Sequence, residues 1–268
     1  MTGQTTLLSR TRAELSAHLE EEILSGRMAT GEKLPSEREL ADRHSVSRPV
    51  VREALRSLIE RNLVEVVPGR GTYVRAARPA DAASGMEALL RRSQPTPRDL
   101  VEARTMLECV AAGLAAERAT AADETAMVDA LDRFDEATGL LEQARFDLAF
   151  HLAIARAAHN PVIETMFGAI TSLTIELMLR SLGDPVVAPT SLPYHRTIYD
   201  AIRRHDAERA RTDMAAHLDV AARTYGADFD RTLESVAQRE LRRLLTPGLT
   251  LEDLMATLPE GGIDGARR

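Results

Sequence analysis

Cysteine is almost absent from this chain, and long apolar runs are missing from it. The single cysteine, Cys109, cannot form a disulfide within one chain, which is typical of proteins kept in a reducing compartment. We expect its thiol to be buried and unreactive. No stretch approaches the ~20 consecutive apolar residues that a membrane helix needs, and the first residues lack the apolar core of a signal peptide. These absences predict a cytoplasmic protein that has no membrane partner.

Acidic and basic residues are distributed unevenly along the 268 residues, a length sufficient for two domains. Residues 1–78 contain 13 lysines and arginines against 11 acidic residues, a net charge of +2. Residues 79–268 contain 21 against 30, a net charge of −9. The overall charge of −7 argues weakly against nucleic-acid binding, but the mildly basic N-terminal part removes that objection. Its modest charge predicts few phosphate contacts per subunit, so tight DNA binding would need a homodimer.

The most informative segment is residues 34–74, LPSERELADRHSVSRPVVREALRSLIERNLVEVVPGRGTYV. Ser36 is a good helix N-cap, and Glu39 completes a capping box that predicts a short helix. Ser47 is placed to cap a second helix, with Pro49 in its first turn, where a missing N–H costs little. This second helix has one apolar face, formed by Val50 or Val51, Ala54, Leu55, Leu58 and Ile59.

A two-strand hairpin is predicted to follow these two helices. The segments Leu63–Val67 and Thr72–Arg75 have strand character, and the turn Pro68-Gly69-Arg70-Gly71 joins them. A further helix is expected to precede them over residues 9–26, with Leu15, Leu19, Ile23 and Leu24 on one side. Three helices and a glycine-flanked hairpin predict a winged helix-turn-helix domain, and therefore DNA binding.

Arginines occupy the polar face of the second helix of this motif. Arg48 and Arg52 are four residues apart and share a face, while Arg38 stands on the first turn of the preceding helix. Arginine binds guanine O6 and N7 with two hydrogen bonds, the commonest specific contact in the major groove. The alternative is that these arginines are only solvated charge. The helices, the cap and the wing together favour a role in DNA recognition.

Three motifs of this segment resemble a known family. LPSERELA, VSRPVVREAL and NLVEVVPGRGTYV look like the DNA-binding domain of the GntR family of bacterial transcription regulators, over about residues 10–75. The resemblance implies that Arg38, Arg48 and Arg52 are the main base or backbone contacts. It also implies that Ser47 contacts a phosphate and that Gly69 lies at the wing tip.

The remainder of the chain has a helical pattern almost throughout, so we expect a mainly α protein with an all-α helical bundle behind the winged domain. The expected boundaries are 9–75 for the winged domain, 76–82 for a linker, 83–245 for the helical domain, and 246–268 for a flexible tail. The expected helices of the bundle are 84–92, 97–118, 121–138, 141–158, 161–181, 189–205, 207–226 and 229–245.

Three histidines and one carboxylate of the helical domain form a candidate metal site. Asp147 and His151 are four residues apart on one predicted helix, so their side chains point the same way. His195 and His217 lie on two later helices, without a local signature of their own. This set suits a divalent metal ion, with zinc preferred and nickel, iron or manganese acceptable. By spacing alone, however, chance is the better explanation.

A second resemblance strengthens the metal hypothesis. RFDLAFHLAIARAAHNPVI, YHRTIYDAI and DMAAHLDVA look like the FCD ligand-binding domain of the FadR subgroup, over roughly residues 83–228. In metal-binding members of that subgroup an aspartate and three histidines line the cavity, which implies the ligands Asp147, His151, His195 and His217. The resemblance also implies that Arg104 binds an effector carboxylate. The alternative for Arg104 is an ion pair with Glu108, four residues on.

Three functions are compatible with this combination of domains. The first is a homodimeric transcription regulator, expected to be a repressor, that binds a short inverted repeat of double-stranded DNA and responds to a small organic acid. The second is a metal sensor, in which the metal itself is the signal. The third is a helical-bundle metalloenzyme. The sequence argues against it, because no residue stands out as a paired general base. We therefore expect a regulator and not an enzyme.

Overall fold

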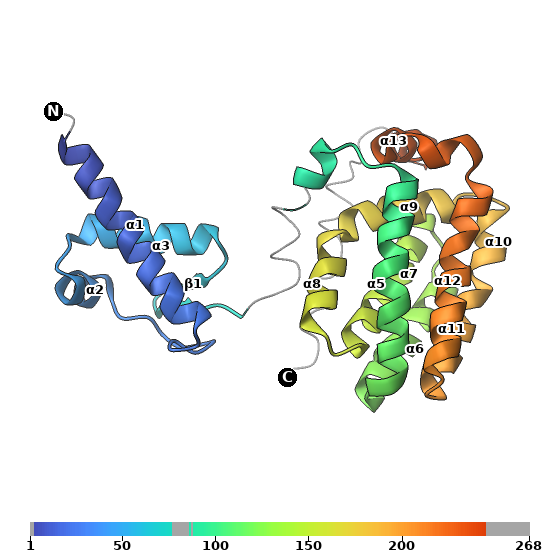
Figure 1. Cartoon of the computed structure of the whole chain (residues 1–268), viewed down its shortest axis with the longest axis horizontal. Helices are drawn as coiled ribbons and strands as arrows, with labels where there is room; N and C mark the ends of the chain where they lie inside the picture. The colour runs from blue at the N-terminus through green and yellow to red at the C-terminus, as the bar shows by residue number, and fades with distance from the viewer. Residues whose placement is uncertain (1–2, 77–85, 87, 245–268) are drawn as a thin grey trace. The chain divides into compact units, whose positions relative to one another are not determined.

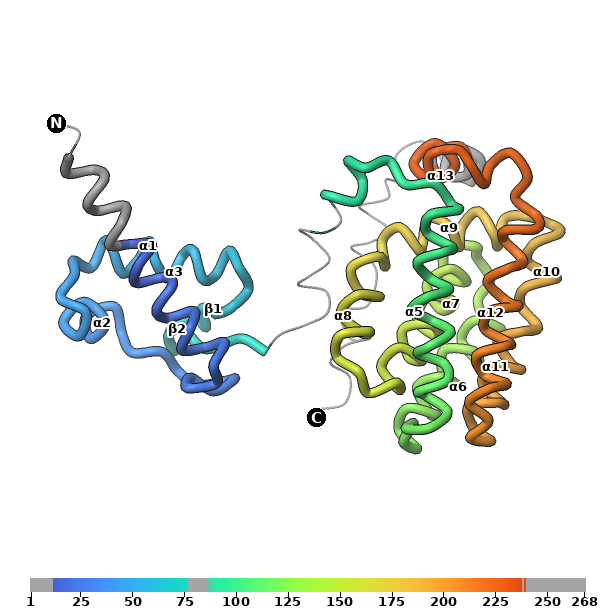
Figure 2. The backbone as a smooth tube through the Cα atoms, in the orientation of Figure 1, coloured from blue at the N-terminus to red at the C-terminus, as the bar shows by residue number. Residues whose placement is uncertain are grey.

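The structure is a computed structural model that describes residues 3–76, 86 and 88–244 (Figure 1, Figure 2). Contacts divide the chain into two compact units, residues 1–81 and residues 82–268. The predicted tail and most of the predicted linker lie outside the described residues.

The N-terminal unit is a winged helix-turn-helix, as predicted. The two strands pair antiparallel, with Val64 opposite Val74 and Val67 opposite Gly71. They form a two-stranded sheet, and Lys33 adds an isolated bridge to Tyr73 beside it. The elements of the unit are α1 (Gly3–Leu24), α2 (Glu37–His44), α3 (Arg48–Glu60), β1 (Val64–Val67) and β2 (Gly71–Val74).

The core of this unit forms where the apolar faces of its helices meet. Leu19 of α1 and Leu58 of α3 are both essentially fully buried, and α1 packs against α3. Two of the predicted core positions are instead exposed, since Leu24 is 69% exposed and Ile59 is 38% exposed. Leu24 is the last residue of α1, and Ile59 is the last but one of α3. A prediction from helical periodicity alone therefore placed one residue too many on the apolar face of each helix, at its C-terminal end.

Local hydrogen bonds explain where the two helices of the motif begin. The Ser36 hydroxyl accepts from the Glu39 N–H, and the Glu39 carboxylate accepts from the Ser36 N–H at 2.8 Å, so the predicted capping box is confirmed. Ser47 holds the N-cap position of α3, with Pro49 in the first turn, but its side chain makes no capping hydrogen bond. Helix α2 ends at Ser45, whose φ of 53° places it in the left-handed region. The short turn between α2 and α3 follows from these caps.

The C-terminal unit is an all-α bundle, also as predicted (Figure 1). Residues 88–92 form a short helical segment that precedes α5 in the chain. Helix α5 packs most extensively against α12, and α6 packs against α7. The elements are α5 (Pro97–Arg118), α6 (Ala121–Glu136), α7 (Leu140–Ala157), α8 (Pro161–Ala169), α9 (Thr171–Leu182), α10 (Val187–Ser191), α11 (Pro193–Arg203), α12 (Ala207–Thr224), the 3-10 helix η1 (Gly226–Asp230) and α13 (Leu233–Leu244).

Two helices predicted as continuous are each divided in the structure. The predicted helix 161–181 breaks at Ile170, where α8 and α9 meet at an angle of 63°. Both halves are apolar, so the hydropathy pattern contains no signal for the break. The predicted helix 189–205 breaks before Pro193, because proline has no N–H to donate and starts a new helix more readily than it continues one.

No single helix in the described part of the chain is long and apolar enough to cross a membrane. Helices α8 and α9 satisfy that test only when taken together, across their bend. Most of α9 is buried within the bundle, which is the ordinary situation of a core helix.

Candidate DNA-binding surface and metal site

The predicted DNA-binding arginines lie on the exposed face of the winged domain. Arg48 begins α3 and Arg52 follows one turn later, with side chains 62% and 64% exposed. Arg38 lies in the first turn of α2 and is also exposed. The opposite face of α3 is buried, with Val51, Ala54 and Leu58 in the core. The helix therefore presents its arginines outward on a rigid support.

A carboxylate that the sequence interpretation missed contacts two of these arginines. Glu37, the first residue of α2, accepts hydrogen bonds from Arg52: Nη2 lies 3.1 Å from Oε2, and Nε lies 3.3 Å from Oε1. The Nη2 atom of Arg48 lies 3.6 Å from the same Oε2. The hydrogen bond from Arg52 lowers the pKa of Glu37 below its usual range. No sequence spacing signals this contact, because it joins two helices.

Glycines shape the tip of the wing between β1 and β2. Gly69 has a φ of 73°, and a side chain at this position would meet no other atom within 4 Å. Glycine is therefore required at this position by the backbone conformation and not by lack of space, since other residues are strained at positive φ. The Arg70 N–H donates to the Val67 carbonyl at 3.0 Å and closes the turn. Gly69, the glycine predicted for the wing tip, thus lies in a hydrogen-bonded turn with free space around it.

The four predicted metal ligands come together from three helices of the bundle. Asp147 and His151 lie on α7, His195 on α11 and His217 on α12, and all four side chains are buried. One ligand nitrogen from each histidine lies within 4.8 Å of the other two. The Oδ1 atom of Asp147 lies 3.2 Å from His195 Nε2 and 3.4 Å from His151 Nε2. Residues without any shared local signature therefore form one cluster.

Three polar atoms of this cluster are buried and find no hydrogen-bond partner among the described residues. They are Asp147 Oδ1, His151 Nε2 and His195 Nε2. Buried polar groups in folded proteins nearly always have a partner, because an unsatisfied one costs about 1–3 kcal/mol. One carboxylate oxygen and two imidazole nitrogens that converge in this way fit a divalent cation. The donor set is therefore chemically suited to the predicted metal.

Other side chains hold two of the imidazoles in place. Glu108 of α5 contacts His151 through Nδ1, and the Ser191 hydroxyl lies 3.0 Å from Nδ1 of His217. Metal-ligating histidines commonly use their second nitrogen in this way, which orients the first nitrogen toward the ion. The sequence interpretation named Glu108 only as a partner for Arg104, and it missed Ser191. The one sequence feature that pointed to Glu108 was its position four residues after Arg104.

Arg104 is an almost fully buried cation beside the cluster. Its Nε lies 2.5 Å from Glu108 Oε1, which is the geometry of the predicted ion-pair alternative. Its Nη2 atom is buried and has no hydrogen-bond partner in the described part of the chain. One side of the guanidinium thus binds Glu108, while the other offers a donor to an anionic group. The two interpretations of Arg104 are geometrically compatible.

Burial and neighbouring charges set the protonation of these groups. Burial lowers the pKa of His195 to about 4 and that of His217 well below its usual value. Burial alone would raise the pKa of Glu108, but Arg104 and His151 outweigh it and lower that pKa to about 2. At neutral pH, His195 and His217 are therefore neutral, which is the form that coordinates metal.

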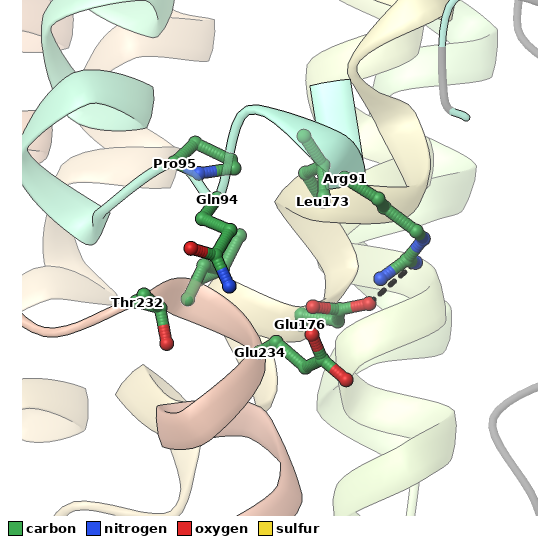
Figure 3. Close-up of a pocket in the computed structure, with 8 residues that line it drawn as sticks. Arg91, Gln94, Pro95, Leu173, Glu176, Thr232 and Glu234 are labelled. Atoms are coloured by element: carbon green, nitrogen blue, oxygen red, sulfur yellow. Dashed lines mark hydrogen bonds and ion pairs between the residues drawn. The ribbon is translucent and has the colours of Figure 1, made fainter. Parts of the chain in front are cut away.

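A separate pocket lies beside the first turn of α13 (Figure 3). Arg91 and Glu176 form an ion pair at one side of it, with 2.6 Å between Nη2 and Oε1. Its volume of about 10 Å³ has room for a single water molecule. None of the predicted ligands lines it. The pocket is too small for an effector, and we assign it no role.

Comparison with protein families gives two matches that together cover most of both units. Residues 11–74 match the bacterial regulatory proteins of the gntR family, and residues 99–220 match the FCD domain. Neither match depends on the arrangement of the candidate site.

Comparison with individual proteins identifies regulators. The chain is 34% identical over 203 residues to the HTH-type transcriptional regulator LutR of Bacillus subtilis (strain 168), covering 73% of this chain and 92% of the relative. It is 31% identical over 215 residues to the galactonate operon transcriptional repressor of Escherichia coli (strain K12), covering 77% and 92%. It is 31% identical over 208 residues to the Glc operon transcriptional activator of the same strain, covering 73% and 82%.

A solved structure extends the similarity to the fold. Streptococcus agalactiae GntR matches with a TM-score of 0.62 at 27% identity, covering 80% of this chain and 99% of that chain. The two-part architecture described above is therefore that of a known class of protein.

Proposed function

Since this chain belongs to the GntR family of bacterial regulatory proteins and carries an FCD domain, we propose that it is a transcription regulator that responds to a small organic acid bound beside a divalent metal ion. Both resemblances expected from the sequence motifs, to this family and to its FadR subgroup, are confirmed. The relatives are transcription regulators, which also confirms that the chain is a regulator and not an enzyme.

The convergence of unsatisfied buried atoms supports the metal part of the proposal. Within residues 3–76, 86 and 88–244, no hydrogen-bond partner is found for Asp147 Oδ1, His151 Nε2 or His195 Nε2. His217 would complete a set of four ligands. Zinc suits these donors best, and nickel, iron or manganese would also be accepted. Four protein ligands leave room for a carboxylate in a five- or six-coordinate site.

The unused side of Arg104 supports the effector part. Its buried Nη2 donor would bind one oxygen of a carboxylate whose other oxygen approaches the metal. A small organic acid satisfies both requirements with a charge-assisted hydrogen bond, which is about twice as strong as the bond that a neutral oxygen would accept from Arg104. We therefore infer a carboxylate effector.

The DNA part of the proposal rests on the exposed arginines of α3. We infer that Arg48 and Arg52 contact bases, with Arg38, Ser47 and Gly69 at the backbone or in the grooves. The modest charge of one winged domain favours a homodimer that binds a short inverted repeat with a guanine in each half. A bacterial operator lies in the cytoplasm, so the proposal places the chain there.

The direction of regulation is proposed as repression that the effector relieves. One relative is named a repressor and another an activator, so the family alone does not fix the sign. An effector can shift DNA binding only by binding the two conformations of the regulator with different affinity. A promoter fused to a reporter gene, measured with and without the effector, gives the sign directly.

A metal sensor is the second candidate, because the same four ligands would serve it. The two functions differ in what releases DNA. Apo protein, zinc-loaded protein and zinc-loaded protein with a panel of carboxylic acids are compared for binding to a selected DNA duplex. A change on adding zinc alone supports the sensor, and a change only on adding the acid supports the proposed function.

A further inference from the structure

The contact between Glu37 and Arg52 fixes which edge of the arginine is available to DNA. A guanidinium has two edges that can each donate a pair of parallel hydrogen bonds: one formed by Nε and Nη2, the other by Nη1 and Nη2. Glu37 binds the first, with Nε 3.3 Å from Oε1 and Nη2 3.1 Å from Oε2. The second edge points away from Glu37 and matches the O6 and N7 acceptors of guanine.

The same contact restrains a long side chain that would otherwise be free. Arg52 is 64% exposed, and in solution such a side chain samples many rotamers. A free arginine on a recognition helix can reach a base or a neighbouring phosphate, and the phosphate carries no sequence information. Glu37 stands on α2, a different helix, and its backbone is fixed by the first turn of that helix. The carboxylate therefore limits Arg52 to one direction.

The charge of Glu37 is unfavourable for DNA binding in general. It adds a negative charge on the arginine-bearing face of a unit whose net charge is only +2 over residues 1–78, and the DNA backbone is itself strongly negative. An exposed ion pair also contributes little stability, about 0–1 kcal/mol. General affinity for DNA does not account for a carboxylate at this position. A carboxylate in the first turn of α2 also stabilises that helix by about 0.3–1 kcal/mol, but only its hydrogen bonds to Arg52 bear on DNA recognition.

We propose that Glu37 is a specificity-determining residue of the DNA-binding domain, which positions Arg52 so that its Nη1/Nη2 edge meets a guanine and not a phosphate. This inference rests on the proposed function, in which Arg52 contacts a base. It predicts that removal of the carboxylate weakens binding to the specific DNA site and strengthens binding to DNA of unrelated sequence.

The test compares four variants of the full chain with the wild type: Glu37→Gln, Glu37→Asp, Arg52→Ala and Glu60→Gln. Glu37→Gln removes the charge, and Glu37→Asp retains the charge but withdraws the carboxylate from Arg52. Glu60 pairs with Arg56 on the exposed surface of α3, at 3.2 Å, so Glu60→Gln is a control for loss of one negative charge. The probes are a duplex selected from a random library by the wild type, its single-base variants, and a scrambled duplex of equal length.

The expected result is a loss of discrimination specific to Glu37. Both Glu37 variants should lower the ratio of selected to scrambled affinity by about five-fold or more, the lower end of a bidentate guanine contact. The loss should occur at the same base position at which Arg52→Ala loses preference. Glu37→Gln should also bind the scrambled duplex more tightly, with a salt slope greater by about one as Arg52 turns to a phosphate. Glu60→Gln should leave the ratio within two-fold of wild type.

Two results would overturn the inference, and they are distinguishable. If Arg52→Ala lowers the ratio but both Glu37 variants behave like Glu60→Gln, Arg52 contacts a base without help from Glu37. If Arg52→Ala itself leaves the ratio unchanged, the proposed base contact fails and the inference fails with it. Thermal unfolding of each variant, expected within a few degrees of wild type, confirms that the comparison is made on folded protein.

Discussion

The Oδ1 atom of Asp147 on α7 lies 3.2 Å from the Nε2 atom of His195 on α11, and neither atom has a hydrogen bond to any described residue. Two buried polar atoms this close without a hydrogen bond are costly unless something else lies between or beside them. His151 and His217 bring further imidazole nitrogens to the same place. This relationship is the basis of the metal proposal.

Arg104→Lys should weaken carboxylate binding about ten-fold or more while leaving the metal content unchanged. Lysine retains the positive charge beside Glu108 but lacks the planar second donor that Arg104 Nη2 offers. Isothermal titration with the acid that most raises the unfolding temperature measures the affinity. The matched control is Arg98→Lys on the same helix, an exposed pair with Asp230, which should change neither quantity. Loss of metal in Arg104→Lys would contradict the assigned roles.

Metal occupancy should fall as pH drops, beginning above the ordinary imidazole value of about 6.5. Burial would lower the pKa of His151, but Glu108 and Asp147 outweigh it and raise that pKa. A proton therefore competes for His151 first, and His195, with a pKa of about 4, is protonated later. Zinc release to a coloured chelator between pH 5 and pH 8 measures this. Glu108→Gln removes the charge that raises the pKa of His151, while the glutamine oxygen can still accept from Nδ1 and keep the ring oriented. Release should therefore shift to lower pH, and a shift to higher pH would contradict the account.

Cys109 is only partly buried, and not fully buried as the sequence led us to expect, but it should still resist alkylation at pH 8. Burial, followed by the nearby Glu108, raises the pKa of its thiol to about 11, and the thiolate is the reactive form. The rate of reaction with iodoacetamide on folded protein should therefore remain far below that of a free thiol. It should increase only as pH approaches 11. Rapid labelling at pH 8 in the folded state would show that the thiol is more accessible than the structure indicates.

Leu58→Ala should destabilise the winged domain by about 2–5 kcal/mol, because Leu58 is fully buried in its core. The neighbouring Ile59→Ala is the matched control, since Ile59 is 38% exposed and should cost less than about 1 kcal/mol. Urea unfolding followed by circular dichroism measures both. Equal effects of the two substitutions would mean that α3 packs in a different register.

The winged domain could be predicted from the sequence almost completely. Its determinants are local: the Ser36 cap, the apolar spacing of α3, and the glycine at the wing tip that positive φ requires. What the sequence did not reveal depends on packing. Glu37 contacts Arg52 only because α2 and α3 cross, and no periodicity reports a contact between helices.

The bundle was predictable as helical, but its details were not. The break at Ile170 lies within an apolar stretch, so hydropathy is the same on both sides of it. The four proposed metal ligands were named through a family resemblance, since His195 and His217 have no signature within their own helices. Glu108 and Ser191, which orient two of the imidazoles, become recognisable only when α5 and α10 are placed beside them.

The central claim is tested most directly by elemental analysis of purified protein, wild type beside the double variant His151→Ala, His217→Ala. The control is the double variant His159→Asn, His205→Asn, which removes two histidines outside the cluster. Asparagine is used there because both positions have positive φ, which it tolerates. The account predicts about one divalent metal ion per subunit in the wild type and the control, and almost none in the first variant, with DNA binding retained. Equal metal content in all three proteins would contradict it.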